Sequence, residues 1–506
     1  MADAKREIER KYESDDSGLP DLTGVGKVTT VLDKGVVELD ATYYDTEDER
    51  LARSALTLRR RTGGSDAGWH LKFPVSRDVR DEIRAPLSDT LPHSLAALVR
   101  SRVRDTELRP VVRLRSARDV RHLVDADGRV LAEVSVDDVT ADRLSGPGEG
   151  AKAQWTEIEV ELADDVDPAL LDKVEKRLRK AGVRPSSSPS KLARALAETT
   201  PKAKQPKRKQ PGEPPEPQTA GDHVLAYVRA QRDAIVGLDP AVRRDEYDSV
   251  HSMRVATRRM RSAFRSYGKI LDRTVTDPVG EELKWLAAEL GVDRDREVLT
   301  DHITSALGDL PRTLVSGPVR TRLRTWANAR RGGSRRRLIG VLDSKRYLTL
   351  LDTLDALVAD PPLRAAAAGK PEKVIAKVVR KDFARLSALV EQAIDLTPGQ
   401  DRDLALHEAR KKAKRARYAA EAATPALGDP AADLTKSMKS LQTLLGDHQD
   451  SVMVRLTLRE LAAVAHAAGE SSFTYGVLYG REEQRAAAVE AELPGVWAET
   501  EAGASV

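Results

Sequence analysis

The sequence predicts two domains of different fold class: an α+β domain built on an antiparallel β-barrel, followed by an all-α domain with an internal repeat. Two observations support this. Up to residue 198, apolar residues alternate with charged ones between glycine and proline turns, which is typical of strands. Beyond residue 222, leucine and alanine recur every three or four residues, which is typical of helices.

A proline- and lysine-rich stretch separates the two patterns. Residues 199–221 offer little to bury and favour extended structure, so we expect a linker there. This places a barrel domain at 4–198 and a helical domain at 222–495. A length of 506 residues agrees with at least two hydrophobic cores.

Composition argues against several classes of protein. Hydrophobic residues make up 40% and charged residues 32%, as in a globular chain with a charged surface. No run approaches the roughly 18 apolar residues of a membrane span, and no secretory segment opens the chain, so we expect a cytoplasmic location. The absence of cysteine excludes disulfides and thiolate ligands and leaves carboxylate, histidine or substrate oxygen to bind a metal. Aromatic residues, at 4%, count against stacking on single-stranded nucleic acid.

Turn signals divide the first domain into its elements. We expect strands around seven centres: Ile8, Tyr43-Tyr44, Leu56–Leu58, Trp69–Leu71, Val111-Val112, Val134–Val136 and Ile158–Val160. We expect helices at Leu91–Arg104 and Pro168–Ala181, the second preceded by the capping residue Asp167.

Charges in this domain are sorted by strand. Alternate residues of a strand share a face, which groups the following sets: Glu7, Glu9 and Lys11; Arg59 and Arg61; His70 and Lys72; Arg113 and Arg115; Glu133, Ser135 and Asp137; Glu157, Glu159 and Glu161. A solvated sheet face would explain any one strand. Whole strands of one sign instead indicate a closed barrel with its charges inside, where cations hold a polyanion and carboxylates hold a divalent cation. Helices would then cover the apolar outside.

Hydrolysis of a phosphoanhydride needs such a set of groups. The charge on the phosphoryl oxygens must be neutralised, and a metal and a water must be positioned. The arginine fork suits phosphate. The GxxxxGK[ST] phosphate loop does not occur, which disfavours a P-loop enzyme.

The motifs Glu7-x-Glu9-x-Lys11, Arg59-x-Arg61, Lys72, Glu157-x-Glu159-x-Glu161 and Ser190-Lys191 together resemble the CYTH domain, or triphosphate tunnel metalloenzyme fold, over about residues 4–198. The resemblance implies a barrel of about eight strands that acts on triphosphates with Mg²⁺ or Mn²⁺. It implies substrate-binding residues at Lys11, Arg59, Arg61, Lys72, Arg113, Arg115 and Lys191, although Arg113-x-Arg115 stands where the family often has Lys-x-Arg. It implies metal ligands at Glu7, Glu9, Asp137, Glu157, Glu159 and Glu161, with Glu7, Glu9 and Lys11 in catalytic roles.

The helical domain repeats itself. One basic stripe, at helical spacing, consists of His251, Arg254, Arg258 and Arg261, and a second consists of His407, Arg410, Lys414 and Arg417, 156 positions later. Leu290-Gly291 recurs in the same way as Leu445-Gly446. Two matched motifs at nearly one offset indicate a duplicated helical unit. A solvated basic face would explain one stripe, whereas two stripes with a histidine in each favour a long polyanion lying across both.

This half resembles the CHAD domain over about residues 220–495, through the two His-x-x-Arg helices and the two Leu-Gly segments. The resemblance implies a helical bundle of two repeats that binds inorganic polyphosphate through the two stripes.

Both halves together predict metal-dependent hydrolysis of a triphosphate, inorganic tripolyphosphate first, coupled to polyphosphate binding. The same barrel would suit thiamine triphosphate, a nucleotide, or cyclisation to cAMP. A non-catalytic polyphosphate-binding or granule-associated scaffold is a third hypothesis, which the full acidic set disfavours. Nucleic acid is a weaker alternative, because no recognition motif is present. The oligomeric state stays open.

Overall fold

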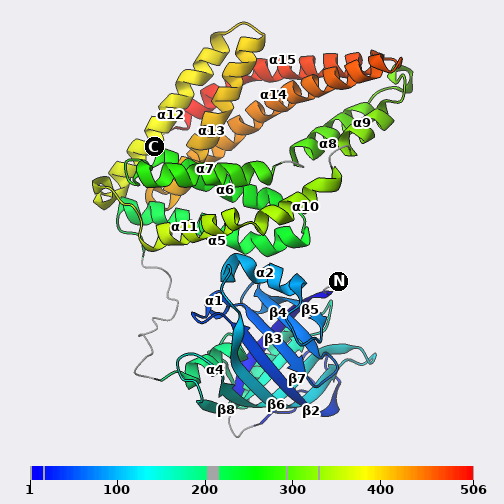
Figure 1. The fold of residues 1–506 in the computed structure, drawn as a ribbon, viewed down its shortest axis with the longest axis vertical. Coiled ribbons are helices and arrows are strands. Elements are labelled where there is room, and N and C mark those ends of the chain that lie inside the picture. Colours follow the sequence, from blue (N-terminus) through cyan, green and yellow to red (C-terminus); the bar gives the residue numbers. More distant parts are fainter. Residues whose placement is uncertain (1–2, 15–17, 202–215, 292–293, 329–330, 505–506) are drawn as a thin grey trace. The chain divides into compact units, whose positions relative to one another are not determined.

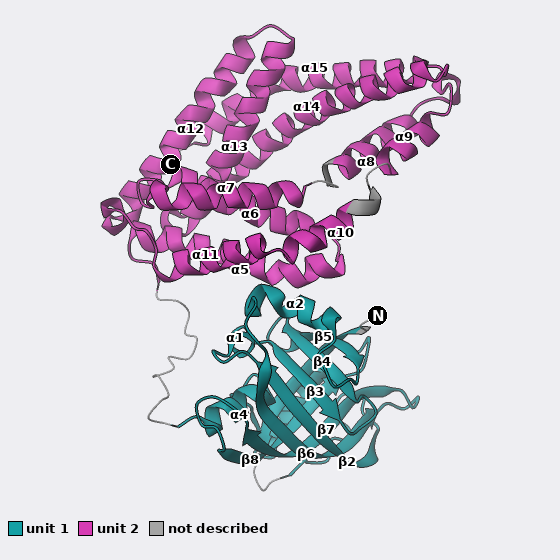
Figure 2. Ribbon diagram, in the orientation of Figure 1, with its two compact units in different colours: residues 1–212 teal, residues 213–506 magenta. Residues whose placement is uncertain are grey.

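A computed structural model of the chain describes residues 3–14, 18–201, 216–291, 294–328 and 331–504. The chain divides into two compact units, residues 1–212 and 213–506, each with its own core (Figure 2). Most of the expected linker lies outside the described residues. Within the described ranges, no helix has the length and apolar character needed to cross a membrane.

The first unit is a closed antiparallel barrel of eight strands, as predicted (Figure 1). The strands are β1 (Asp3–Ser14), β2 (Thr30–Asp45), β3 (Thr57–Thr62), β4 (Gly68–Pro74), β5 (Val79–Pro86), β6 (Arg109–Val124), β7 (Val130–Arg143) and β8 (Lys152–Leu162). Their order is β5-β4-β3-β2-β6-β7-β8-β1, and the first half of β1 closes the barrel by pairing with β5. The second half of β1 pairs with β8 and with the short β9 (Arg184–Pro185).

Alternation along the strands gives the barrel an apolar outside and a charged inside. On β3, Leu58 is fully buried on the outer face while Arg59 lines the interior. The helices on the barrel are α1 (Arg50–Arg53), α2 (His93–Val103), α3 (Ala169–Lys180) and α4 (Lys191–Thr199). α2 packs on the outer residues of β3, β4 and β5, and α3 on those of β1, β7 and β8. The helices therefore cover the apolar face, as the sequence indicated.

One end of the barrel interior is apolar, because α4 packs there. Ser190 caps this helix by accepting a hydrogen bond from the amide of Ala193. Leu192 and Leu196 of α4 share a buried cluster with Val112 and Leu114 of β6. Val112 pairs directly with Tyr43, a residue of β2 that lines the cavity, so the even-numbered positions of β6 face inward.

The second unit is all helical. Its helices are α5 (Ala220–Arg244), α6 (Ser249–Ser266), α7 (Arg273–Glu289), α8 (Arg294–Gly308), α9 (Val319–Asn328), α10 (Arg331–Leu342), α11 (Lys345–Ala359), α12 (Pro371–Asp395), α13 (Gln400–Leu427), α14 (Asp429–Ala467) and α15 (Phe473–Ala502). Consecutive helices from α12 to α15 pack side by side (Figure 1). One large core joins α5, α6, α7, α11, α12 and α13 to the end of α10, to the first part of α14 and to the C-terminal half of α15. A smaller core joins α8 and α9 to the C-terminal part of α14 and the start of α15.

The two predicted copies occupy matching places in this unit. α6 and α13 carry the two basic stripes and pack against each other. In the first copy a Cβ on Gly291 would lie 2.7 Å from Cζ of Arg254, and in the second a Cβ on Gly446 would lie 3.6 Å from Nη2 of Arg410. Each arginine therefore lies over a glycine, which gives the repeated Leu-Gly motif a physical reason.

Candidate active site

The barrel encloses a cavity of about 520 Å³ lined mostly by charged side chains. A volume of this size is typical of a small-molecule site. Nine of the residues expected at the site line it: Glu7, Glu9, Lys11, Arg59, Arg61, Lys72, Glu159, Glu161 and Lys191. They come from β1, β3, β4, β8 and the first turn of α4, so closure of the barrel brings residues distant in sequence into one space.

Glu7 is buried, with 2% of its surface exposed, and accepts a hydrogen bond from Nζ of Lys72 at 2.5 Å. Nη2 of Arg84 lies 3.5 Å from its other oxygen. Burial, together with the carboxylates of Glu82 and Glu161, outweighs these cations and raises the pKa of Glu7 to about 7. Near neutral pH this carboxyl group can therefore accept or release a proton.

Glu9, two residues later on the same face, has the opposite character. The ammonium of Lys11 lies 2.8 Å from Glu9 and 2.5 Å from Glu159. Burial alone would favour the neutral acid, but Lys11 and Lys72 hold the pKa of Glu9 at about 2. Near neutral pH, Glu9 is therefore ionised, whereas Glu7 can gain or lose a proton.

Three carboxylates of the barrel wall form a cluster that could hold a metal. Asp137 on β7 and Glu157 and Glu159 on β8 place oxygens within 4.8 Å of one another. Nζ of Lys191 contacts all three, at 3.0, 2.7 and 2.7 Å, so a positive charge already lies among them. Oxygen donors in this arrangement fit Mg²⁺ or Mn²⁺. Asp137 and Glu157 are buried, at 0% and 3% exposure.

Arg118 of β6 is a cavity residue that the sequence analysis did not single out. Its Nε and Nη2 donate to Oδ1 and Oδ2 of Asp137 at 2.7 and 2.8 Å, and Nη2 also donates to Glu159 at 2.8 Å. The strand was expected only around Val111-Val112, whereas it runs on to Val124. The longer strand brings Arg118 inside.

The expected position of Arg113 and Arg115 inside the tunnel is wrong. Their side chains are 49% and 52% exposed on the outer face, where Arg113 pairs with Asp40, and Arg115 pairs with Asp142 at 2.8 Å. The prediction rested on every apolar position of a strand lying on the outer face. Leu114, between the two arginines, instead faces inward against α4, which turns both arginines outward.

β5, a strand that was not predicted, also contributes charged side chains to the cavity. Arg80, Glu82 and Arg84 line the cavity. Glu82 is 1% exposed, pairs with Arg84, and lies 2.9 Å from Nδ1 of His70. Burial would raise the pKa of Glu82, but His70 and Lys72 keep it low. The spacing Arg-x-Glu-x-Arg was the available signal, and the strand was overlooked because it contains few apolar residues.

Arg59 and Arg61 of β3 crowd the cavity with positive charge. Nη1 of Arg59 donates to the hydroxyl of Tyr43 at 3.3 Å. Arg61 pairs with Asp66, yet burial and repulsion from Arg59 and Arg118 lower the pKa of Arg61 to about 9. An anion placed here would relieve that repulsion.

In the helical unit the two stripes meet on one surface. Burial, with Arg410 on the same helix and Arg258 and Arg254 on α6, lowers the pKa of Lys414 to about 7. One turn beyond Arg258, burial likewise lowers the pKa of Arg261. Three arginines from two helices thus lie near Lys414 and disfavour its charge.

The histidines and the last arginine of the stripes lie nearby on the same helices. Nδ1 of His407 lies 2.5 Å from Oε1 of Gln449 on α14. Arg417 donates to Oε1 of Gln442 at 3.1 Å. His251 of the first copy is exposed. The structure therefore places the eight predicted residues along two neighbouring helices, and the role of each stays a prediction.

A closed barrel with a charged tunnel defines the first unit as a triphosphate-tunnel type of domain, and a duplicated basic helical bundle follows it. Family models agree with both assignments: the CYTH domain model matches residues 5–196 and the CHAD domain model matches residues 226–459. The chain belongs to the family in which a CYTH domain is followed by a CHAD domain, as the sequence indicated.

The chain is similar to curated relatives over most of its length and to solved structures over part of it. An uncharacterized protein of Mycobacterium tuberculosis, from strains CDC 1551 / Oshkosh and H37Rv, is 41% identical over 493 residues, which covers 94% of this chain and 92% of the relative. PptA from Streptomyces chartreusis is 19% identical with a TM-score of 0.47 and covers 55% of this chain and 99% of that one. The CHAD domain from the plant Ricinus communis is 23% identical with a TM-score of 0.42, covering 57% and 93%.

Proposed function

We propose that the barrel domain hydrolyses a triphosphate, with inorganic tripolyphosphate as the substrate, in a reaction that depends on Mg²⁺ or Mn²⁺. The composition of the cavity carries the proposal. Ten lysine and arginine side chains and seven carboxylates line it, so a polyanion and a divalent cation find complementary charge in one space. Tyr43 is the sole aromatic among the described lining residues apart from a histidine, and it leaves little surface for a nucleobase or thiazole ring.

Each group would have a separate task. Lys11, Arg59, Arg61, Lys72 and Lys191, with Arg118 added by the structure, would neutralise the phosphoryl oxygens and hold the chain in line. A bound divalent cation would supply further charge neutralisation and help to position the attacking water. The cluster of Asp137, Glu157 and Glu159 fits that cation best, with Glu7, Glu9 and Glu161 in reach of the same cavity.

Glu7 suits the role of general base. A base is most effective when its pKa lies near the working pH, and Glu7 meets this condition while Glu9 stays ionised. Glu7 would accept the proton that the attacking water loses, and Lys72, hydrogen-bonded to Glu7, would stabilise the carboxylate beforehand.

The helical domain would bind polyphosphate through the surface where its two stripes meet. Repulsion among Lys414, Arg410, Arg254 and Arg258 is the supporting observation, because a polyanion would reverse it. Tethering this surface to the barrel would raise the local concentration of chain ends near the tunnel.

Phosphate release from tripolyphosphate, ATP and thiamine triphosphate, each with Mg²⁺, Mn²⁺ or EDTA, tests the proposal. Metal-dependent release that is fastest on tripolyphosphate is the expected result. Glu159→Gln, which removes one acid of the cluster, should lower turnover at least tenfold. Fastest release from ATP or thiamine triphosphate would instead assign an organic triphosphate.

A non-catalytic polyphosphate-binding protein is the second candidate, and one contact favours it. Lys191 already lies among the three acids that fit a metal. If the Lys191 ammonium stayed among these acids in place of a metal ion, a triphosphate would bind without turnover. Retention of polyphosphate with no release under any metal would identify this function.

A further inference from the structure

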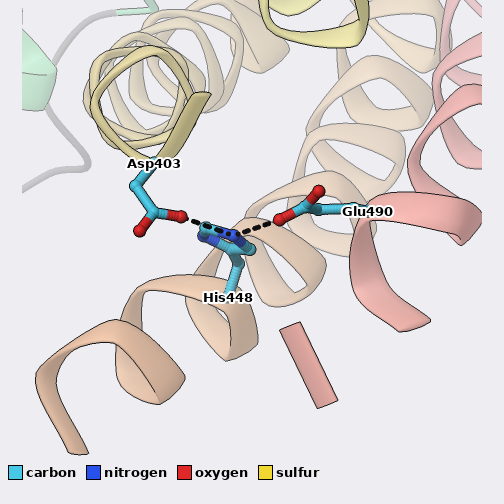
Figure 3. Close-up of side chains that lie close together, drawn as sticks. All are labelled: Asp403, His448 and Glu490. Carbon is cyan, nitrogen blue, oxygen red and sulfur yellow. Dashed lines mark hydrogen bonds and ion pairs between the residues drawn. The ribbon is translucent and has the colours of Figure 1, made fainter. Parts of the chain in front are cut away.

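A second group of residues that could hold a metal lies in the helical unit, one turn from His407 of the second stripe. Asp403 of α13, His448 of α14 and Glu490 of α15 point toward one another from three helices (Figure 3). Nε2 of His448 lies 3.3 Å from Oδ1 of Asp403 and 3.2 Å from Oε1 of Glu490. Together these residues offer one nitrogen and two oxygens at one point.

One hydrogen bond, between Nε2 of His448 and Oε1 of Glu490 at 3.2 Å, accounts for only part of this geometry. A single Nε2–H can point well at one oxygen, yet two carboxylate oxygens approach the same nitrogen. Both separations exceed the roughly 2.7–2.9 Å of a charge-assisted hydrogen bond. Ligands at zinc distances in a tetrahedral arrangement are about 3.4 Å apart, which is close to the observed 3.2 and 3.3 Å.

The surroundings hold the donor atoms in place. The other oxygen of Asp403 lies 3.2 Å from Nη2 of Arg455, and the other oxygen of Glu490 lies 3.2 Å from Nη1 of Arg402. Metal-bound carboxylates are commonly oriented by such partners. His448 is 1% exposed, whereas the side chain of Asp403 is 24% exposed and leaves a path from solvent.

We propose that Asp403, His448 and Glu490 form a structural site for one divalent transition-metal ion, Zn²⁺ by preference, that ties α13, α14 and α15 together. Imidazole with two carboxylates suits zinc and its neighbours in the first transition row, whereas Mg²⁺ prefers oxygen alone. The site belongs to the second repeat. The position in the first repeat that corresponds to Asp403 is Tyr247, which is 97% exposed, so one ion per chain is expected.

The inference is independent of the tunnel and of its proposed reaction. Co²⁺ replaces Zn²⁺ in such sites and absorbs visible light when tetrahedral, so it reports binding without any activity. The experiment titrates the full chain with Co²⁺ in excess Mg²⁺, which occupies all-oxygen sites such as the acid cluster of the barrel. We expect a visible band that saturates at one Co²⁺ per chain and disappears when Zn²⁺ is added.

Two variants and a matched control assign the band to residues. His448→Gln should abolish it, and Asp403→Asn should weaken Co²⁺ binding at least tenfold. His302→Gln is the control, because His302 is likewise paired with a carboxylate, Glu482 at 2.8 Å, and the band should persist. Far-UV circular dichroism checks that each variant folds. If His448→Gln does not fold, the Co²⁺ affinity of Asp403→Asn tests the assignment. No band in the wild type, or a band that survives in both site variants, would overturn the proposal.

Discussion

Arg118 and Asp137 form a two-point ion pair inside the barrel, with Nε to Oδ1 at 2.7 Å and Nη2 to Oδ2 at 2.8 Å. The pair joins neighbouring strands at a direct cross-strand position. It brings a fixed guanidinium to the wall of the cavity, next to the acids that fit a metal. Arg118 is therefore a stronger candidate for a phosphate contact than the arginines at 113 and 115.

Replacing Arg118 should weaken substrate binding. We expect Arg118→Gln to raise KM for tripolyphosphate about tenfold or more, because a hydrogen bond to a charged group contributes about 1.5–3 kcal/mol. Arg115→Gln is the matched control on the same strand, and its exposed side chain should leave KM within about twofold, the level of a surface change. Steady-state kinetics on both variants give the two KM values. Equal damage from the two substitutions would contradict the outward position of Arg115.

The barrel could be predicted from the sequence because apolar and charged residues alternate wherever a strand has one apolar and one charged face. That held on β1, β3, β4 and β8, whose charged residues line the cavity. The alternation gave a wrong orientation for β6, because both faces of this strand carry apolar residues. Leu114 faces inward against α4, although an apolar residue was expected on the outer face. It failed on β5 because Asp81 interrupts the outer face that carries Val79, Ile83 and Ala85, so few apolar positions mark the strand.

The helical half shows a different limit. The duplication was readable because each stripe lies within one helix, and the structure confirms the helical fold. The group formed by Asp403, His448 and Glu490 could not be predicted from the sequence. Each residue lies on a different helix, so no spacing along the chain marks the three as neighbours. Only the packing of α13, α14 and α15 brings the three together.

The raised pKa of Glu7 predicts a pH-dependent stability. The folded pKa of about 7 exceeds the ordinary value of 4.5, so between these values the folded state holds a proton that the unfolded state has released. The stabilisation is full below pH 4.5 and declines as pH rises through 7, by about 3 kcal/mol at most. Thermal unfolding of the wild type and of Glu7→Gln from pH 5 to 8 measures it. The wild type should lose stability relative to the variant, and a constant difference would mean that the pKa of Glu7 is not raised.

Lys414 should make polyphosphate binding depend on pH. Its pKa of about 7 means that the free protein carries the charge at pH 6 and lacks most of it at pH 8, and a bound polyanion would restore it. We expect affinity about tenfold weaker at pH 8 than at pH 6, with proton uptake near pH 7 visible by calorimetry in buffers of different ionisation enthalpy. The contribution of Lys414 is the part of the pH dependence that Lys414→Met removes. Lys411→Met, an exposed lysine of the same helix, should leave the profile unchanged.

The glycines under the two arginines should respond differently to one added methyl group. A Cβ on Gly291 would meet the Arg254 guanidinium at 2.7 Å, closer than atoms in contact can lie, whereas a Cβ on Gly446 would lie 3.6 Å from Arg410 in ordinary contact. Because the obstacle at Gly291 is the end of a flexible side chain, Arg254 would move before the helix does. Gly291→Ala should therefore weaken polyphosphate binding several-fold with little loss of thermal stability.

Gly446→Ala is the built-in comparison and should bind polyphosphate like the wild type. Titration of both variants with a polyphosphate of defined length gives the affinities, and unfolding curves give the stabilities. If Gly291→Ala bound normally, the position of Arg254 would not matter for the polyanion, and the first stripe would be a solvated basic face. If Gly446→Ala weakened binding to the same degree, the glycines would act through the helices, since the contact at Gly446 leaves Arg410 where it is.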